Sequence, residues 1–141
     1  MGASGRTLQS AVALIVMLGA GALVPAISQQ QTPATKVTPL LKEAIAELPG
    51  REIIVVTLDI PPGGGSPPHR HPGHHIFGYV LEGTYKLKLD QGAETILTKA
   101  FHEAPGQLHA VSANASLTEP AKVLAFIVAE SGKPITVPEK Q

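Results

Sequence analysis

The sequence contains no cysteine and no tryptophan among its 141 residues. Without cysteine the chain can form no disulfide, no thiolate metal site and no cysteine nucleophile, and it cannot carry a lipid on an N-terminal cysteine. It also lacks an excess of either charge, because 11 basic residues balance 11 acidic ones. This balance argues against a nucleic-acid partner and against a polybasic membrane patch.

Aromatic residues are also scarce, with three phenylalanines and two tyrosines. A hydrophobic core must therefore be built from valine, isoleucine, leucine and alanine. These residue types still suffice for one folded domain of about 110 residues. The length leaves no room for a second domain of ordinary size.

Residues 1–28 are typical of a secretory signal peptide. Arg6 is the only charged residue before Lys36, and an apolar run follows it from 11 to 24. The small residues Ala26 and Ser28 then offer a cleavage site, after Ser28 or alternatively after Ala26. A membrane anchor is disfavoured, because the apolar run is shorter than the ~20 residues of a spanning helix and contains glycine. We therefore expect a secreted or periplasmic protein with no stable membrane anchor after cleavage.

Residues 29–50 are predicted to form a linker and one short helix. Thr38 and Pro39 resemble a helix start, with a capping residue before a proline in the first turn. Apolar residues then recur at helical spacing, at Leu40, Leu41, Ala44, Ile45 and Leu48. Pro49 and Gly50 would end this helix.

From residue 51 onward the pattern is that of strands. β-branched or alternating runs separated by turn residues occur at 52–60, 69–71, 77–82, 85–89, 94–99, 108–112 and 123–129. Short strands with turns every 8–12 residues indicate an antiparallel β-sandwich or barrel. We therefore predict an all-β domain over residues 51–141.

Histidines are concentrated in one stretch, where His69, His71, His74 and His75 lie within seven residues. Neutral imidazole is the commonest protein ligand for metals. Because strand side chains alternate, His69 and His71 would share one face of a strand. An exposed metal-scavenging tract is disfavoured, because strand-like sequence surrounds the cluster.

Two motifs give this sequence its resemblance to the cupin superfamily, specifically to small single-domain cupins of type 2. The first family motif is G-x5-H-x-H-x(3 or 4)-E-x6-G, and Gly63, His69 and His71 match it in type and spacing. The second is weaker, with Gly106 and His109 matching its G-x2-H core. The resemblance covers roughly residues 51–129 and implies a jelly-roll barrel, the double-stranded β-helix.

The position of the third motif ligand depends on the local strand geometry. His75 occupies the place of the family's glutamate if the strand bulges at Gly78. Without a bulge, Ile76 occupies that place and His74 shares its face. The third ligand is then His74, or it is missing.

The resemblance implies one divalent transition metal inside the barrel, held by His69, His71, His75 and His109. Iron, nickel, copper, zinc and manganese all suit such ligands, although a set without a carboxylate is less suited to manganese. Glu103 is our candidate acid–base group, and Glu82 and His102 are further candidates for hydrogen bonds to the ligands. Arg70 points to the opposite face and suits a surface or dimer contact.

Two functions are compatible with these residues. One is a metal-dependent oxidoreductase, of the dioxygenase kind, acting on a small molecule. The other is a non-catalytic module that binds a metal or a small ligand. The resemblance also implies a homodimer, formed by strand exchange or by sheet packing.

Overall fold

The computed structural model describes residues 31–140, so the predicted signal peptide lies outside the described residues. Eleven strands and no helix make up this part. The strands are β1 (Lys36–Ala44), β2 (Arg51–Ile60), β3 (Gly65–Ser66), β4 (His69–Arg70), β5 (His75–Glu82), β6 (Tyr85–Leu89), β7 (Thr95–Leu97), β8 (Ala100–Glu103), β9 (Leu108–Asn114), β10 (Ala121–Glu130) and β11 (Val137–Pro138). Residues 31–140 accordingly include no helix that is long and apolar enough to span a membrane.

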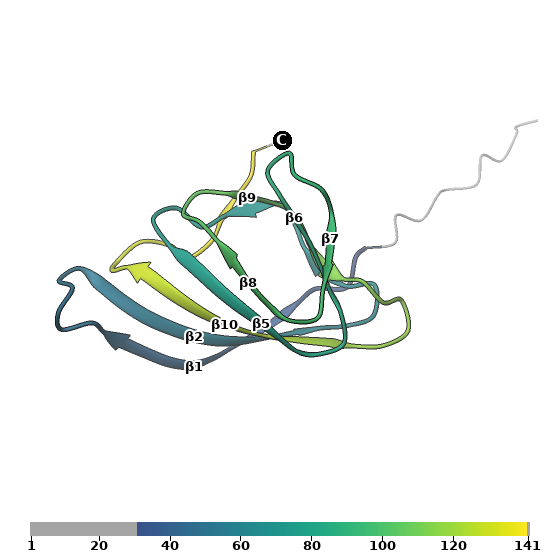
Figure 1. Cartoon of the computed structure of the whole chain (residues 1–141), viewed down its shortest axis with the longest axis horizontal. Coiled ribbons are helices and arrows are strands. Elements are labelled where there is room, and N and C mark those ends of the chain that lie inside the picture. The colour runs from purple at the N-terminus through teal and green to yellow at the C-terminus, as the bar shows by residue number, and fades with distance from the viewer. Residues whose placement is uncertain (1–30, 141) are drawn as a thin grey trace, which may run out of the picture.

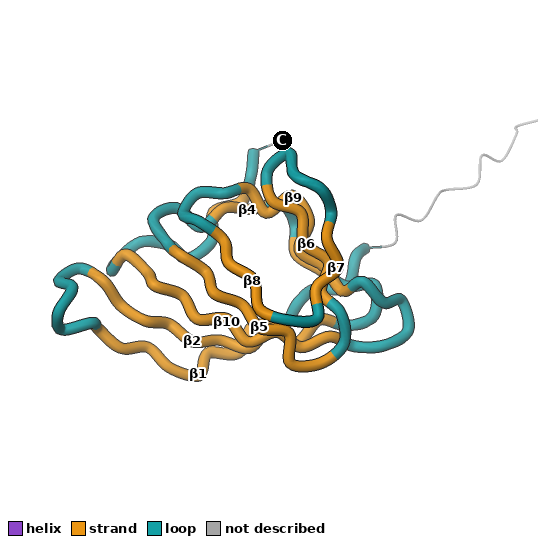
Figure 2. Tube along the Cα trace, viewed as in Figure 1, coloured by secondary structure: helices purple, strands orange, loops and turns teal. Residues whose placement is uncertain are grey.

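The strands form two sheets that face each other (Figures 1 and 2). One sheet has the order β1-β2-β10-β5-β8, and the other has the order β11-β4-β9-β6-β7, with β3 beside β9. Every pairing between these strands is antiparallel. In Figure 1 the five-stranded sheet forms the lower layer, and β9, β6 and β7 lie above it.

The core lies between the sheets and follows from strand alternation. Strand β10 buries every second residue, namely Val123, Ala125, Ile127 and Ala129. Two clusters of buried hydrophobic residues result, one that includes Val123 and one that includes Ala125, Ile127 and Ala129. The predicted all-β antiparallel barrel is thus confirmed.

The helix predicted over residues 39–48 is wrong. Residues 36–44 form β1, which pairs along β2 and shifts register between Pro39 and Leu41. Because β1 is the edge of its sheet, it tolerates a proline that cannot donate a backbone hydrogen bond. The sheet therefore starts at Lys36, earlier than the boundary predicted at residue 51.

Gly78 does not form the predicted bulge. It pairs regularly with Ala125 on one side and Phe101 on the other. The shift of register in β5 lies further on, at Leu81, between the pairs Val80–Val123 and Glu82–Lys122. Glycine is required at 78 because a Cβ there would lie 2.1 Å from the Phe101 ring.

Candidate metal centre

Three histidines converge between the two sheets. His69 lies on β4 directly opposite His109 on β9, and His71 follows β4. Each offers one ring nitrogen, and the three nitrogens lie within 4.8 Å of one another. The structure therefore brings together three of the four predicted ligands in an arrangement that could hold a metal ion.

Two similar turns fix the backbone around this cluster. Residues 71–74 and 104–107 each contain a Pro–Gly pair, and the glycines have positive φ, 80° at Gly73 and 77° at Gly106. Proline followed by a positive-φ glycine is the signature of a type II turn. The Gly106 N–H donates to the His71 carbonyl at 3.1 Å, which joins the two turns.

Backbone carbonyls determine which ring nitrogen of His69 and His71 is free. The Nδ1–H of His69 donates to the Pro67 carbonyl at 2.7 Å, and the Nδ1–H of His71 donates to the Ile135 carbonyl at 2.6 Å. A carbonyl only accepts, so Nδ1 carries the hydrogen and Nε2 keeps its lone pair. Such contacts orient histidine ligands in metal sites.

Burial also favours the uncharged form of these two rings. Desolvation is the main cause that lowers the pKa of His69 and of His71 below 6.5, and it outweighs the carbonyl hydrogen bonds, which raise it. The neighbouring histidines also lower these pKa values, whereas the charge of Glu103 raises them. Neutral imidazole is the form that binds a metal.

Glu103 joins the cluster from the opposite sheet, at the end of β8. Its carboxylate oxygen Oε2 forms an ion-pair contact with His109 Nε2 and lies 3.9 Å from His71 Nε2. This oxygen and both ring nitrogens of His109 are buried without a hydrogen-bond partner in residues 31–140. Buried polar atoms normally have partners. The lack of partners for Glu103 Oε2 and for one His109 nitrogen fits a metal ion, which would accept a lone pair from each of these two atoms, while the other His109 nitrogen carries the hydrogen of the neutral ring.

The segment from 134 to 139, which we call the strap, holds the histidines from outside. The carbonyls of Pro134 and Ile135 accept hydrogen bonds from His74 and His71, and β11 pairs with β4. Glu139 anchors the strap through two bonds to Arg70, at 2.6 and 3.1 Å. Arg70 thus faces away from the cluster, as predicted, but it contacts the protein's own strap.

The structure does not place His74 or His75 among the three histidines. His74 is fully buried, and both of its ring nitrogens are used: Nε2–H donates to Pro134, and Nδ1 accepts from the Glu130 N–H. His75 lies on the outer face of β5, where its Nδ1 is 3.1 Å from His102 Nε2. The structure therefore does not bring His75, a predicted ligand, to the cluster, because β5 has no bulge at Gly78.

Ile76 occupies the position that the motif gives to a carboxylate. It is buried and lies opposite Glu103 in the β5–β8 pairing. The sequence contained this signal, since four residues between His71 and Ile76 place Gly83 in register with the motif. The hydrogen bond from His71 to the Ile135 carbonyl could not be predicted from the sequence, because any residue supplies a backbone carbonyl. Glu82 lies at the exposed end of β5.

A largely apolar cavity of about 840 Å³ adjoins the cluster. Its walls include Ile54, Val56, Leu58, Phe101, Val123, Ala125 and Ile127 from the five-stranded sheet. Ser112 and Tyr85 also border it, but their hydroxyls bond each other at 2.7 Å, and burial raises the pKa of Tyr85 above its usual range. The site therefore combines the polar cluster of histidines and Glu103 with apolar cavity walls.

Comparison with known proteins agrees with this fold. A double-stranded β-helix protein from Klebsiella pneumoniae is similar with a TM-score of 0.60 and 18% identity, over 77% of this chain and 86% of that chain. A cupin-like protein from Thermotoga maritima gives 0.59 and 18%, over 76% and 77%. Oxalate oxidase in complex with glycolate gives 0.58 and 21%, over 77% of this chain and 57% of the oxidase. At these identities the similarity shows the fold alone.

No curated protein sequence matches this chain significantly. The family model of the cupin domain, however, matches residues 56–127, which run from β2 to β10 and include all three converging histidines. The chain therefore belongs to the cupin family.

Proposed function

We propose that this protein binds one divalent transition metal and uses it to act on a small, largely apolar molecule. The observation that carries the proposal is the convergence of three histidine nitrogens beside an apolar cavity. Oxalate oxidase, which is similar in fold, was solved with the small molecule glycolate. That similarity supports a small-molecule ligand but names none for this chain.

We assign Glu103 as the fourth ligand, in place of the acid–base role expected from the sequence. Glu103 is 2% exposed, and its carboxylate has no lysine or arginine partner within the described residues. An ionised carboxylate in such a place is costly unless a cation compensates it. A neighbouring strand thus supplies the carboxylate that Ile76 cannot.

This assignment changes the expected metal. Three imidazoles and one carboxylate form a harder set than histidines alone, so manganese and iron suit it as well as nickel or zinc. A bound metal with open positions would supply Lewis acidity or a site for dioxygen. The chain itself holds the ligand rings in one tautomer and surrounds the bound molecule with aliphatic walls, which exclude water.

Metal analysis of the purified protein tests the site. We expect about one equivalent of a transition metal in the wild type and at least about tenfold weaker binding in Glu103→Gln. Glu82→Gln, on the exposed end of β5, is the matched control and should bind as the wild type does. A wild type that binds no metal after reconstitution would overturn the proposed function.

A double substitution separates a ligand from a merely structural carboxylate. Ile76→Glu combined with Glu103→Gln returns the carboxylate to β5 and should restore metal binding. If Glu103 only pairs with His109, Glu103→Gln will lower the thermal midpoint of the metal-free protein but leave metal affinity unchanged. That result would remove Glu103 from the ligand set and leave the histidine site intact.

Oxygen consumption tests the reaction class. The metal-loaded protein should consume dioxygen with at least one member of a panel of phenolic and diketone compounds. Metal-dependent binding of such a compound without oxygen consumption would identify the protein as a binding module instead. Ala125→Leu, which narrows the cavity, should weaken ligand binding while the metal content stays unchanged.

We also propose that the protein is exported and that residues 1–28 are removed. The charge, apolar run and small residues of that segment support this proposal. Mass spectrometry of the mature protein from its native host should find Gln29 as the first residue. An intact N-terminus would contradict export by this route.

A further inference from the structure

Two hydroxyl groups lie in the largely apolar wall of the cavity. Tyr85 on β6 and Ser112 on β9 are only 3% and 5% exposed, and both border the cavity. Their oxygens lie 2.7 Å apart, so one hydroxyl donates a hydrogen bond to the other. The proposed metal chemistry uses the four ligands and the aliphatic walls, and it gives this pair no part.

An irregularity in β9 turns Ser112 toward the same interior as His109. Leu89 of β6 pairs with His109 and Leu87 pairs with Ser112, so one extra residue of β9 lies between the two pairs. This extra residue offsets the strand alternation, and both His109 and Ser112 are buried although they are three positions apart. The two residues of β6 between these pairs span about 7 Å. One small molecule can therefore reach both the metal centre and the hydroxyl pair.

The two hydroxyl groups have one hydrogen more than their mutual bond uses. Each hydroxyl carries one hydrogen, and the bond between Tyr85 and Ser112 uses only one of the two. Burial is the main cause that raises the pKa of Tyr85, so its phenol keeps its hydrogen at neutral pH. Within residues 31–140 neither hydroxyl has another hydrogen-bond partner. The contents of the cavity must therefore supply the missing acceptor.

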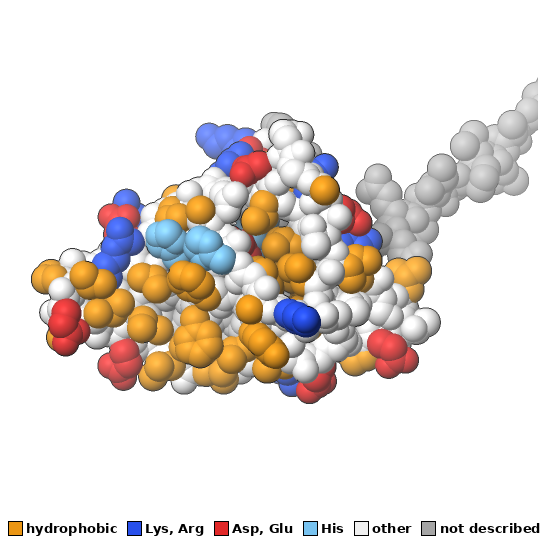
Figure 3. Space-filling model, in the orientation of Figure 1, with side chains coloured by type: hydrophobic (Ala, Val, Ile, Leu, Met, Phe, Trp, Pro, Cys, Tyr) orange, Lys and Arg blue, Asp and Glu red, His pale blue; other side chains and the backbone are white. Residues whose placement is uncertain are grey.

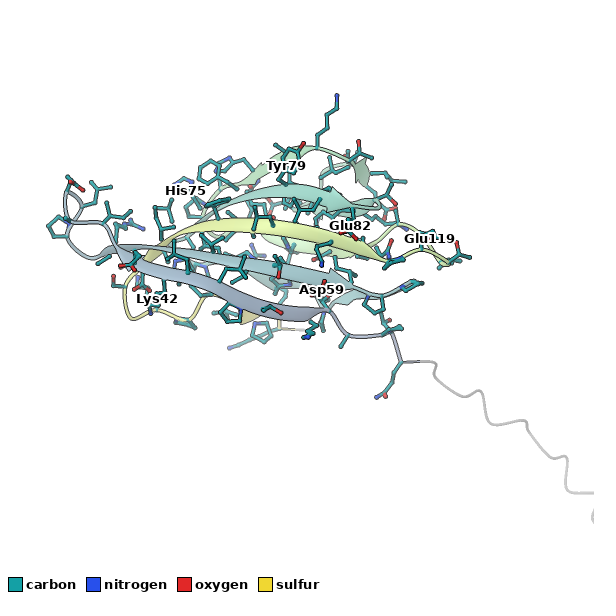
Figure 4. The ribbon with its side chains drawn as sticks, turned by 90° about the horizontal axis from the view of Figure 1, so that it is seen from below. Lys42, Asp59, His75, Tyr79, Glu82 and Glu119 are labelled. Atoms are coloured by element: carbon teal, nitrogen blue, oxygen red, sulfur yellow. The ribbon has the colours of Figure 1, made fainter. Side chains whose placement is uncertain are left out.

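The missing acceptor should be a neutral group. Lys42 is the only lysine or arginine among the described residues of the cavity wall, and its amino group pairs with the Glu52 carboxylate at 3.1 Å. Figure 4 shows Lys42 on β1, the edge strand of the five-stranded sheet, whereas Tyr85 and Ser112 belong to the other sheet. A carboxylate buried beside the hydroxyl pair would lack a compensating cation, which is costly. A ketone or ester carbonyl accepts a hydrogen bond without this cost.

We infer that the molecule bound in the cavity has two oxygen-containing groups, one that binds the metal and a neutral carbonyl that accepts a hydrogen bond from the Tyr85–Ser112 pair. This inference rests on the proposed function, because the first group needs the metal. The second group determines specificity. An analogue without the carbonyl leaves a buried hydroxyl hydrogen unpaired, and a site built to hydrogen-bond its ligand discriminates against such an analogue.

Binding of matched carboxylic acids to the metal-loaded protein tests this inference. Heptanoate offers a carboxylate for the metal and an apolar chain, and the oxoheptanoates add one ketone at different positions of the same chain. Calorimetry should find that the wild type prefers at least one oxoheptanoate to heptanoate. This preference should fall at least about fivefold in the double variant Tyr85→Phe/Ser112→Ala. A wild type that prefers no oxoheptanoate, or an unchanged preference in the double variant, overturns the inference.

A second hydroxyl in the cavity wall supplies the matched control. Ser66 also borders the cavity, but its hydroxyl lies 3.4 Å from that of Thr35 and outside the Tyr85–Ser112 pair. Ser66→Ala should therefore keep the wild-type preference. An equal loss of preference in Ser66→Ala and in the double variant would show that the effect is not specific to the pair, and would overturn the inference.

The metal content of the double variant separates this inference from the proposed function. Neither substitution removes a proposed ligand, so metal content and the circular dichroism spectrum should match the wild type. His75 and His102 lie on the outer face, where Figure 3 shows histidine side chains at the surface, so His75→Ala is used as the background in every titration. Normal metal content with an unchanged preference contradicts this inference alone, whereas a wild type without metal contradicts the proposed function.

The infrared band of the bound ketone tests the hydrogen bond directly in the wild type. A carbonyl that accepts a hydrogen bond absorbs at lower wavenumber than the same carbonyl in an apolar solvent, so the band of the bound oxoheptanoate should shift in this direction. A band at the apolar-solvent position would overturn the inference. Heptanedioate, whose second group is charged, should bind more weakly than the preferred oxoheptanoate. Tighter binding of heptanedioate would show that the second group is an anion and not a neutral carbonyl.

Discussion

The six histidines have four different environments, distinguished by the partners of their ring nitrogens, and the ring nitrogens of His109 have no hydrogen-bond partner in residues 31–140. His69 and His71 use Nδ1 for carbonyls and leave Nε2 free, whereas both nitrogens of His74 are occupied. His75 and His102 contact each other on the outer face. A lone pair that points into the protein without a partner, rather than histidine alone, identifies the candidate ligands.

Substitution of His74 and His75 should separate structure from metal binding. His74→Ala removes two buried hydrogen bonds and should lower the free energy of unfolding by about 2–3 kcal/mol. His75→Ala, on the surface, should change it by less than about 0.5 kcal/mol. Both folded variants should retain the wild-type metal content. Loss of metal from His75→Ala would show that the ring reaches the centre after all.

Acid should weaken the metal-free protein through His69 and His71. Burial lowers the pKa of both below 6.5, so the unfolded chain, with ordinary histidines, binds protons that the folded state rejects. The free energy of unfolding should therefore fall as pH drops below about 6.5 and change little above it. Urea denaturation between about pH 5 and 7.5 measures this slope. The double variant His69→Asn/His71→Asn should show a smaller slope.

At the scale of elements, the strap supports the histidines from a distant part of the sequence. It lies more than sixty residues beyond His71, yet its Ile135 carbonyl fixes the His71 ring. Arg70, next to His71, binds the end of the same segment through Glu139. The orientation of the His71 ring is therefore supported by an ion pair that lies outside the candidate metal centre.

Releasing the strap should weaken metal binding without removing any ligand. Glu139→Ala breaks the contact with Arg70, and loss of such outer support typically costs 10–100-fold in metal affinity, so we expect about tenfold here. Titration with the metal, followed by the shift in thermal midpoint, measures this effect. Glu94→Ala, which breaks the exposed pair with Lys86, is the control. Equal affinity in the two variants would show that the strap plays no part in metal binding.

The local sequence pattern predicted strands well where one face of the strand is exposed to solvent. Residues 85–89 alternate and form β6 with the predicted bounds. The helix prediction for residues 39–48 failed because their apolar residues suit a helix as well as an edge strand with a register shift. Only pairing with β2 distinguishes the two. Glu103 was singled out from the sequence, but the ligand role that we propose for it was not, because the β5–β8 register that brings it to the site is a tertiary contact.

At the scale of the whole molecule, the candidate site joins the two sheets. His69 and His109 belong to the six-stranded sheet, whereas Glu103 belongs to the five-stranded one. The cavity lies between the same layers. An ion held by all of these residues would cross-link the two sheets of the barrel.

Metal removal should therefore destabilise the entire barrel. At a free metal concentration about 100 times the Kd, binding to the folded state alone adds about 2.7 kcal/mol. Thermal unfolding before and after treatment with a chelator measures this difference. The His69→Gln variant should unfold at the same temperature in both conditions. A wild type that is indifferent to the chelator would argue against a bound metal.

The strap also imposes an order on the assembly of the protein. His69 and His71 are synthesised well before residues 134–139, which hold the His71 ring in its ligand tautomer. The candidate centre cannot reach its final form until residue 139 has emerged and β11 has paired with β4. A metal ion at this centre would therefore be bound in the final geometry only after this segment has been synthesised.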